Sequence, residues 1–242
     1  MKIFKCGKMK LFKLILFTMA IVSQISVNGQ DWPNLERFSE ENAKLGLPAA
    51  GEKRVIFMGN SITQCWSDNH PEFFKGRPYI NRGISGQTTP QMLIRFRQDV
   101  IDLKPAVVVI LAGTNDIAGN TGPSTLEMIA GNIASMAELA ESNGIKVIIC
   151  SVLPAFDYPW KPGQRPDEKI PALNKMLKKY ADDHGIFYLD YFQAMADNRN
   201  GMKTELTYDG VHPNKAGYLV MEPMVENAIK KVLKSHLKRQ SK

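Results

Sequence analysis

A serine stands where an open α/β sheet usually carries its chemistry. Ser61 lies within Gly59-Asn60-Ser61-Ile62-Thr63, directly after the apolar run 55–58. Such a run predicts a buried strand, and these sheets bind ligands at the carboxyl ends of their strands. A serine hydroxyl becomes a nucleophile only when a base takes its proton and a third group holds that base. The alternative is a serine that caps a helix, which is the commonest use of serine at this position.

Residues for such a base stand near the other end of the chain, in Asp209-Gly210-Val211-His212-Pro213. A loop marked by Gly and Pro allows Asp209 to bond one ring nitrogen of His212 while the other nitrogen faces outward. Taken alone, a D-x-x-H segment is more often a turn with an Asp cap and a surface His.

Two further turns offer donors for the oxyanion that develops in acyl transfer. Gly113-Thr114-Asn115-Asp116 follows the apolar run 106–112, which would place Asn115 beside Ser61. The segment Asn81-Arg82-Gly83-Ile84-Ser85-Gly86 is a glycine-rich turn whose backbone N–H groups can point at an anion. Each turn alone is explained by ordinary turn preferences, and it is the order of all four segments that favours one shared site.

For these turns to form one site, the strands before them must end at the same edge of one sheet. Continuous Val, Ile and Leu runs predict buried parallel strands at 54–58, 106–112 and 145–151. Two weaker runs predict further strands at 79–82 and 186–189.

Helices are predicted between and after these strands. Apolar residues at helical spacing occur at 92–103, 126–140, 170–180 and 218–232, and a Ser124-Thr-Leu-Glu127 capping box precedes the second stripe. The alternation of strand and helix predicts a flavodoxin-like, three-layer α/β/α sandwich around a five-stranded parallel sheet.

Taken in order, the four segments resemble the blocks of the SGNH, or GDSL-type, esterase and lipase family. These blocks are a Ser motif, a Gly, a G-x-N-D and a D-x-x-H. The resemblance runs from about Arg54 to the last helix and implies an SGNH hydrolase domain over 54–242. The chain departs from the family motif at Asn60, because the family has Asp before the serine.

The resemblance implies a role for each matching residue. The triad would be Ser61, His212 and Asp209, and the oxyanion donors would be the backbone N–H of Ser61, Gly86 and Asn115. Gly86 is preferred to Gly83, because Gly-Ile-Ser-Gly-Gln-Thr-Thr resembles the family segment in which the later glycine points its N–H inward.

Other chemistries find less support in the sequence. The chain has no G-x-S-x-G elbow, which disfavours the α/β-hydrolase fold, and no G-x-G-x-x-G or P-loop for a nucleotide. Its four histidines are scattered and have no ligand-like spacing, so neither a metal nor a cofactor is expected. Cys65 and Cys150 are predicted to be buried free thiols, with a disulfide as the alternative.

The first 29 residues predict a secretory signal peptide. Lysines at 2, 5, 8, 10 and 13 precede an apolar stretch at 14–22, and Val27-Asn28-Gly29 offers a small-residue cleavage site. The stretch is short for a membrane span, so a retained anchor is the alternative, and Met9 is a second candidate start. The protein is therefore expected to be secreted or periplasmic. Residues 30–53 are predicted to pack as an N-terminal helix or arm.

Charge gives no sign of a nucleic-acid partner. The net charge is +7, and five of the basic residues lie in the predicted leader. Basic and acidic residues are nearly equal in number in the remaining chain, and they do not form the concentrated basic face that nucleic-acid binding needs.

Aromatic residues suggest how a substrate could be bound. Phe156, Tyr158 and Trp160 lie on a proline-rich loop at 153–163, after the strand predicted at 145–151, and Trp66 lies one turn past Ser61. Their rings could contact sugar or wall an acyl pocket, or they could simply be buried.

The sequence thus predicts an exported serine esterase that removes short acyl groups, acetyl in particular, from a small-molecule or oligosaccharide ester. The alternatives are a lysophospholipase or thioesterase, and a non-catalytic carbohydrate-binding domain on the same fold.

Overall fold

A computed structural model describes residues 30–240 of the chain, with side chains described as far as residue 234. The predicted signal peptide lies outside these residues. All elements described below belong to the compact unit that begins at Pro33.

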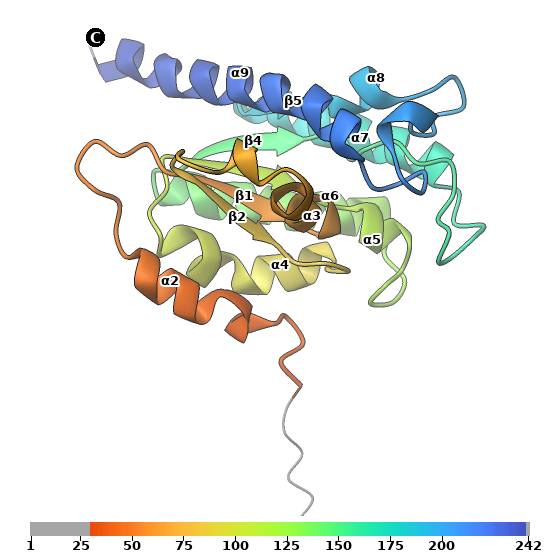
Figure 1. The fold of residues 1–242 in the computed structure, drawn as a ribbon, viewed down its shortest axis with the longest axis horizontal. Helices are drawn as coiled ribbons and strands as arrows, with labels where there is room; N and C mark the ends of the chain where they lie inside the picture. Colours follow the sequence, from red (N-terminus) through yellow and green to blue (C-terminus); the bar gives the residue numbers. More distant parts are fainter. Residues whose placement is uncertain (1–29, 241–242) are drawn as a thin grey trace, which may run out of the picture. The chain divides into compact units, whose positions relative to one another are not determined.

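The described part of the chain forms one sheet of five parallel strands (Figure 1). The strands are β1 Val55–Gly59, β2 Tyr79–Gly83, β3 Val107–Leu111, β4 Lys146–Cys150 and β5 Phe187–Leu189. Their spatial order is β2-β1-β3-β4-β5, and every neighbouring pair is parallel. This is the flavodoxin-like order, which confirms the predicted fold class. The chain reverses its direction of winding between β1 and β3, so the carboxyl ends of these two strands flank the crevice of the sheet.

Helices cover both faces of the sheet, and α4 and α9 lie on opposite sides of it (Figure 1). The helices are α2 Ser39–Leu45, α3 Ser61–Asn69, α4 Thr89–Phe96, α5 Thr114–Ile117, α6 Leu126–Ser142, α7 Pro166–His184, α8 Tyr191–Met195 and α9 Lys215–Gln240. Short 3-10 turns lie at Leu35–Phe38, Pro71–Phe73 and Thr204–Leu206, and a π-helical turn extends α4 at Arg97–Ile101.

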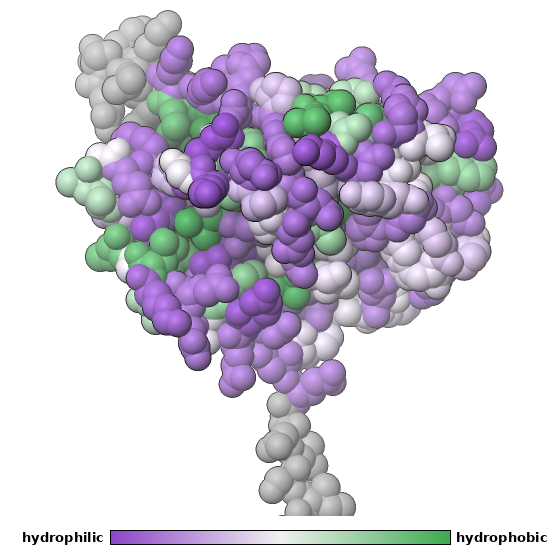
Figure 2. All heavy atoms as spheres, viewed as in Figure 1, coloured by the Kyte–Doolittle hydropathy of each residue, from purple (hydrophilic) through white to green (hydrophobic). Residues whose placement is uncertain are grey.

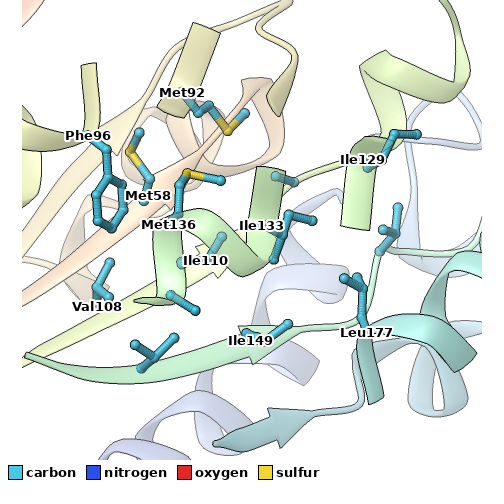
Figure 3. Close-up of a cluster of buried hydrophobic side chains, with 14 of the residues drawn as sticks. Met58, Met92, Phe96, Val108, Ile110, Ile129, Ile133, Met136, Ile149 and Leu177 are labelled. Atoms are coloured by element: carbon cyan, nitrogen blue, oxygen red, sulfur yellow. The ribbon is translucent and has the colours of Figure 1, made fainter. Parts of the chain in front are cut away.

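The sheet separates two hydrophobic clusters. Alternate residues of β3 point to opposite faces: Val108 and Ile110 contact α4, α6 and α7, while Val107 and Val109 lie in the cluster with α3, α8 and α9. Figure 3 shows the first cluster, in which strand residues meet Met92 and Met136 from the covering helices. Burial on both faces explains why these strands read as continuous apolar runs.

One predicted helix start is wrong by a residue. The sequence pattern predicted a capping box that begins at Ser124, whereas α6 is capped by Thr125, whose side chain accepts a hydrogen bond from the Met128 backbone N–H at 3.2 Å. Ser and Thr are both favoured at a helix cap, so residue type alone does not choose between the two positions.

The segment before β1 contains the short helix α2. Its Asn42 side chain accepts hydrogen bonds from Arg82 at 2.7 and 3.0 Å and donates to Asp99 at 2.8 Å. These contacts fasten the segment to β2 and to the turn after α4.

Polar residues cover most of the face seen in Figure 2, where hydrophobic residues form small separate patches. Between residues 30 and 240, no helix combines the length and the apolar character that crossing a bilayer requires.

Candidate active site

Ser61 is the first residue of α3 and lies two positions after Gly59, the last residue of β1. The helix cap is Asn60, whose side-chain oxygen accepts a hydrogen bond from the Ile62 backbone N–H at 3.0 Å. An amide oxygen therefore caps the helix at the position where the family motif has Asp. Because Asn60 is the cap, the Ser61 hydroxyl is free for another partner.

That partner is His212, from the loop before α9. The Ser61 hydroxyl and His212 Nε2 are 2.9 Å apart, and His212 Nδ1 lies 2.8 Å from Asp209 Oδ2. With Asp209 accepting from Nδ1–H, Nε2 is the nitrogen that can accept the hydroxyl proton. The structure thus joins the three residues that were predicted as a triad, although Ser61 lies 151 positions from His212.

The loop that carries this pair is closed by its own hydrogen bonds. Thr207 donates its hydroxyl to the His212 carbonyl at 2.7 Å and accepts from the backbone N–H of Gly210 at 3.0 Å. Asp209 Oδ1 accepts from the backbone N–H groups of Val211 and His212 at 3.0 and 2.8 Å. The carboxylate is therefore fixed on both oxygens before any substrate arrives.

This hydrogen bonding decides the charge of Asp209. Partial burial pushes the pKa of the carboxyl upward, but the hydrogen bonds from His212 and Val211 outweigh burial and hold the pKa below its usual value. Asp209 is thus kept ionised beside the imidazole.

The two candidate glycines of the second block have different structural roles. A Cβ on Gly83 would lie 2.2 Å from the Gln64 backbone nitrogen, so Gly83 permits the close approach of β2 to α3. Gly86 has a φ of +77° and open space around the position of a Cβ. A left-handed glycine in open space can turn its N–H toward a ligand, which favours Gly86 as the donor.

Asn115 lies in α5, directly after β3, and its side chain is buried. Its amide Nδ2 donates to the carbonyl of Gln87 at 3.0 Å, which ties the end of β3 to the loop that contains Gly86. One of the two amide protons is used in this bond, and the other can serve an oxyanion.

Asp116 holds the far end of the loop that contains Gly86, through Thr89. Its carboxylate accepts from the Thr89 backbone N–H at 2.9 Å and from the Thr89 hydroxyl at 2.6 Å, and Asn132 donates to that hydroxyl at 3.0 Å. Burial raises the pKa of Asp116 to about 6, against the lowering effect of the bonds from Thr89.

A buried arginine completes this support, and the sequence-based predictions missed it. Arg95 is 0% exposed and donates to the Gln87 side chain at 2.6 Å, to the Gly59 carbonyl at 3.1 Å and to the Arg82 carbonyl at 2.9 Å. It is paired with the buried Asp99 at 2.9 Å. The available signal was an arginine on the apolar stripe of α4, three residues after Met92.

Two of the four aromatic residues predicted to contact substrate do not reach the surface. Trp66 is 2% exposed, because it stacks between Phe73 and Tyr218 in the core, and its indole N–H donates to Glu222 at 3.2 Å. Tyr158 is 0% exposed. The predictions of substrate contact at Trp66 and Tyr158 are therefore wrong, since packing against other rings uses their faces.

Phe156 and Trp160 are exposed, as substrate contacts must be. Phe156 lines a cavity of about 290 Å³ that also includes Tyr208 and Asp209, and the Arg199 guanidinium lies 4.8 Å from its ring centre. Trp160 lies beside His212, with the two ring centres 6.0 Å apart.

Within the described residues, Cys65 and Cys150 are both free. Cys150 is buried in β4 whereas Cys65 is only partly buried, so the prediction of two free thiols is confirmed and that of full burial holds for Cys150 alone.

Comparison with known proteins identifies the family. A family profile described as the GDSL-like Lipase/Acylhydrolase family matches residues 57–220. The chain belongs to this family. The predicted family is thereby confirmed, and the matched domain is one of the hydrolases that act on esters.

Solved structures of the family are similar over most of the chain. A GDSL-like lipase from Bacteroides thetaiotaomicron is 50% identical with a TM-score of 0.81, and covers 82% of this chain and 98% of its own. A protein from Bacteroides fragilis assigned as an acylhydrolase is 49% identical with a TM-score of 0.82, with 84% and 99% covered.

Curated relatives of this GDSL-family chain include named esterases. An acetylxylan esterase from Xylanibacter ruminicola is 28% identical, over 76% of this chain and 45% of its own length. Esterase TesA from Pseudomonas aeruginosa is 30% identical, over 55% of this chain and 60% of its own. The chain thus spans about half to three fifths of the length of these relatives.

Proposed function

We propose that the protein is an exported serine esterase that removes short acyl groups, acetyl in particular, from carbohydrate esters. The observation that carries the proposal is the hydrogen-bonded chain from the Ser61 hydroxyl through His212 to Asp209, with distances of 2.9 and 2.8 Å. Such a chain supplies the nucleophile, the base and the group that orients the base.

In the first half of the proposed reaction, Ser61 Oγ attacks the carbonyl carbon of the ester and its proton passes to His212 Nε2. The tetrahedral intermediate collapses by breaking the bond between the carbonyl carbon and the alcohol oxygen. His212 gives its proton to that oxygen, and the free alcohol leaves behind an acyl-enzyme. Water then attacks the acyl-enzyme with His212 again as the base, which releases the acid and restores Ser61.

Three donors would stabilise the negative oxygen of both intermediates. They are the backbone N–H of Ser61, the backbone N–H of Gly86 and the side-chain amide of Asn115. Loss of one such donor typically costs about 10²–10³ in turnover. Asn115 is well suited to this role because its bond to the Gln87 carbonyl fixes the amide in advance.

The proposed substrate class rests on two further observations. One relative is an acetylxylan esterase, which acts on an acetylated polysaccharide. The predicted leader would export the enzyme to where such polymers are found, and another relative from Bacillus subtilis is named a lipoprotein. Both support an extracellular or periplasmic ester of a carbohydrate.

A panel of esters tests the proposal. Purified protein is assayed on p-nitrophenyl esters from acetyl to dodecanoyl, on acetylated xylooligosaccharide and on a lysophospholipid. We expect the highest kcat/KM on acetyl esters and a loss on the order of 10⁴-fold or more in Ser61→Ala. Preference for long acyl chains would instead favour a lipase or thioesterase. Absence of hydrolysis across the panel would favour a binding domain.

A further inference from the structure

Trp160 is exposed, yet it is fixed by neighbours on two sides. One side of its indole stacks on the buried ring of Tyr158, with centroids 5.0 Å apart and planes 26° apart. Its N–H donates to the Asn120 side-chain oxygen at 3.3 Å. About 44% of the residue is left exposed. A ring immobilised in this way loses little entropy when a ligand stacks on it.

The two supports of Trp160 connect it to the elements that carry the oxyanion donors. Tyr158 shares a hydrogen bond of 2.9 Å with Thr114, the residue before Asn115. Asn120 donates its side-chain amide to the Gly86 carbonyl at 3.2 Å and its backbone N–H to the Asn115 carbonyl at 3.0 Å. The indole is therefore positioned relative to the reaction centre.

The nearness of Trp160 to His212 points to the part of the ester that it would meet. In the proposed reaction, His212 protonates the departing alcohol oxygen, so this oxygen must come within hydrogen-bond distance of Nε2. The Trp160 ring centre is 6.0 Å from that of His212. A ring attached to the departing oxygen would therefore reach the indole, whereas the acyl group points away from the leaving oxygen.

The surroundings of the indole suit a neutral polar ring. The Asn120 side chain is exposed beside it, and the neighbouring Lys161 ammonium donates to the Gly119 carbonyl at 3.2 Å. A pyranose offers a flat patch of C–H groups to an aromatic face and hydroxyls to polar neighbours of this kind. An extended alkyl chain has no hydrogen-bonding groups to offer these polar neighbours.

We propose that Trp160, held by Tyr158 and Asn120, is a binding platform for the saccharide on the alcohol side of the ester. This inference rests on the proposed function, since it needs the triad to set the direction of the leaving group. It adds a subsite that selects the alcohol and leaves the choice of acyl group to other residues.

Steady-state kinetics of Trp160→Ala test the platform, with two acetates that share an acyl group and differ in the alcohol. We expect the KM for acetylated xylooligosaccharide to rise on the order of tenfold, while kcat/KM for ethyl acetate changes less than about threefold. Trp160→Phe keeps a flat ring without the N–H and should lie between wild type and Trp160→Ala. Leu47→Ala, at an exposed apolar residue after α2, is the surface control and should match wild type.

Three results would overturn the platform. They are an equal loss of kcat/KM on both acetates in Trp160→Ala, an unchanged KM for the xylooligosaccharide, and an altered preference between acetyl and butyryl esters. Circular dichroism and thermal unfolding of each variant exclude a folding defect, and Trp160→Phe supplies the comparison if Trp160→Ala does not fold. Failure of the proposed function itself would appear separately, as residual activity of Ser61→Ala on ethyl acetate.

Discussion

Two parts of the proposed site are built in opposite ways: the base loop, which carries the proposed base His212 with Asp209, and the oxyanion side, which carries the proposed donor Asn115 with its supports Asp116 and Arg95. In the base loop, Asp209 and His212 have side chains that are 37% and 26% exposed, and the hydrogen bonds that shape the loop join residues at most nine positions apart. On the oxyanion side, Asn115, Asp116 and Arg95 are buried, and their bonds span up to 36 positions. The shape of the base loop is thus set by residues close together in the sequence, whereas the oxyanion side depends on the packing of distant segments around the sheet.

This difference determines how each half should respond to substitution. A side chain of the base loop can be changed without opening the core, so its loss should affect chemistry more than folding. A member of the buried network cannot be removed without leaving a polar or charged partner unpaired in the interior, so its loss should affect folding as well.

The two aspartates show the same contrast in their titration. Hydrogen bonds hold the pKa of Asp209 below its usual value despite partial burial, whereas burial raises the pKa of Asp116 to about 6. Asp209 therefore stabilises the fold at neutral pH, and this contribution is lost only as the pH falls through its lowered pKa. The contribution of Asp116 has the opposite sign.

The largest expected effect is on activity, in Asp209→Asn. The amide preserves the size of the side chain but favours the wrong tautomer of His212, so kcat should fall on the order of 10⁴-fold. The free energy of unfolding should change by no more than about 1 kcal/mol, because the loop is partly exposed and locally bonded. Ester kinetics and urea unfolding measure the two quantities. A large loss of stability would show that this loop is as coupled to the core as the oxyanion side.

The next largest expected effect is a loss of stability in Arg95→Met. Removal of the guanidinium leaves the buried Asp99 carboxylate without its positively charged partner, so the free energy of unfolding should fall by about 3–5 kcal/mol. The double variant Arg95→Met with Asp99→Leu should recover part of this loss, because it removes the unpaired charge. Urea unfolding of both variants and of wild type provides the comparison. If Arg95→Met alone costs less than about 1 kcal/mol, the buried network does not support the fold.

The smallest effect is on the pH dependence of stability, through Asp116. Because the folded pKa is about 6 and the ordinary value is 3.8, the folded protein binds more protons than the unfolded chain between these pH values. Stability should therefore fall as the pH rises from about 4 to 6, by roughly 1–3 kcal/mol from this group. The difference between wild type and Asp116→Asn, measured by urea unfolding across this range, isolates the contribution. Parallel curves for the two proteins would contradict the raised pKa.

Much of the architecture was predictable because the central strands β1, β3 and β4 are buried on both faces and therefore consist of continuous apolar runs. The partly buried β2 and β5 gave weaker runs, and all five described strands were predicted to within a residue or two of their ends. The same logic could not predict the role of Arg95. This arginine lies on an apolar stripe, and its hydrogen-bond partners on β1, β2 and the loop after β2 are brought together only by the fold.

The aromatic residues mark the limit of reasoning from residue type. Trp66 and Trp160 have the same side chain and both were predicted to contact substrate, yet Trp66 is enclosed by Phe73 and Tyr218 while Trp160 is exposed beside His212. Exposure depends on what packs against each ring, and Tyr218, which covers Trp66, comes from near the other end of the chain.

By itself, the sequence determined the fold class, the family and the order of the segments that carry a hydroxyl, a glycine turn, an amide and an Asp–His pair. These follow from local patterns, because strand burial and turn preference act over a few residues. Only the tertiary structure decided that Ser61 meets His212, that Arg95 and Asp116 support the loop of the proposed oxyanion donors, and that Trp160 rather than Trp66 is exposed. Those outcomes depend on hydrogen bonds and packing between segments tens to more than a hundred residues apart, which no local pattern specifies.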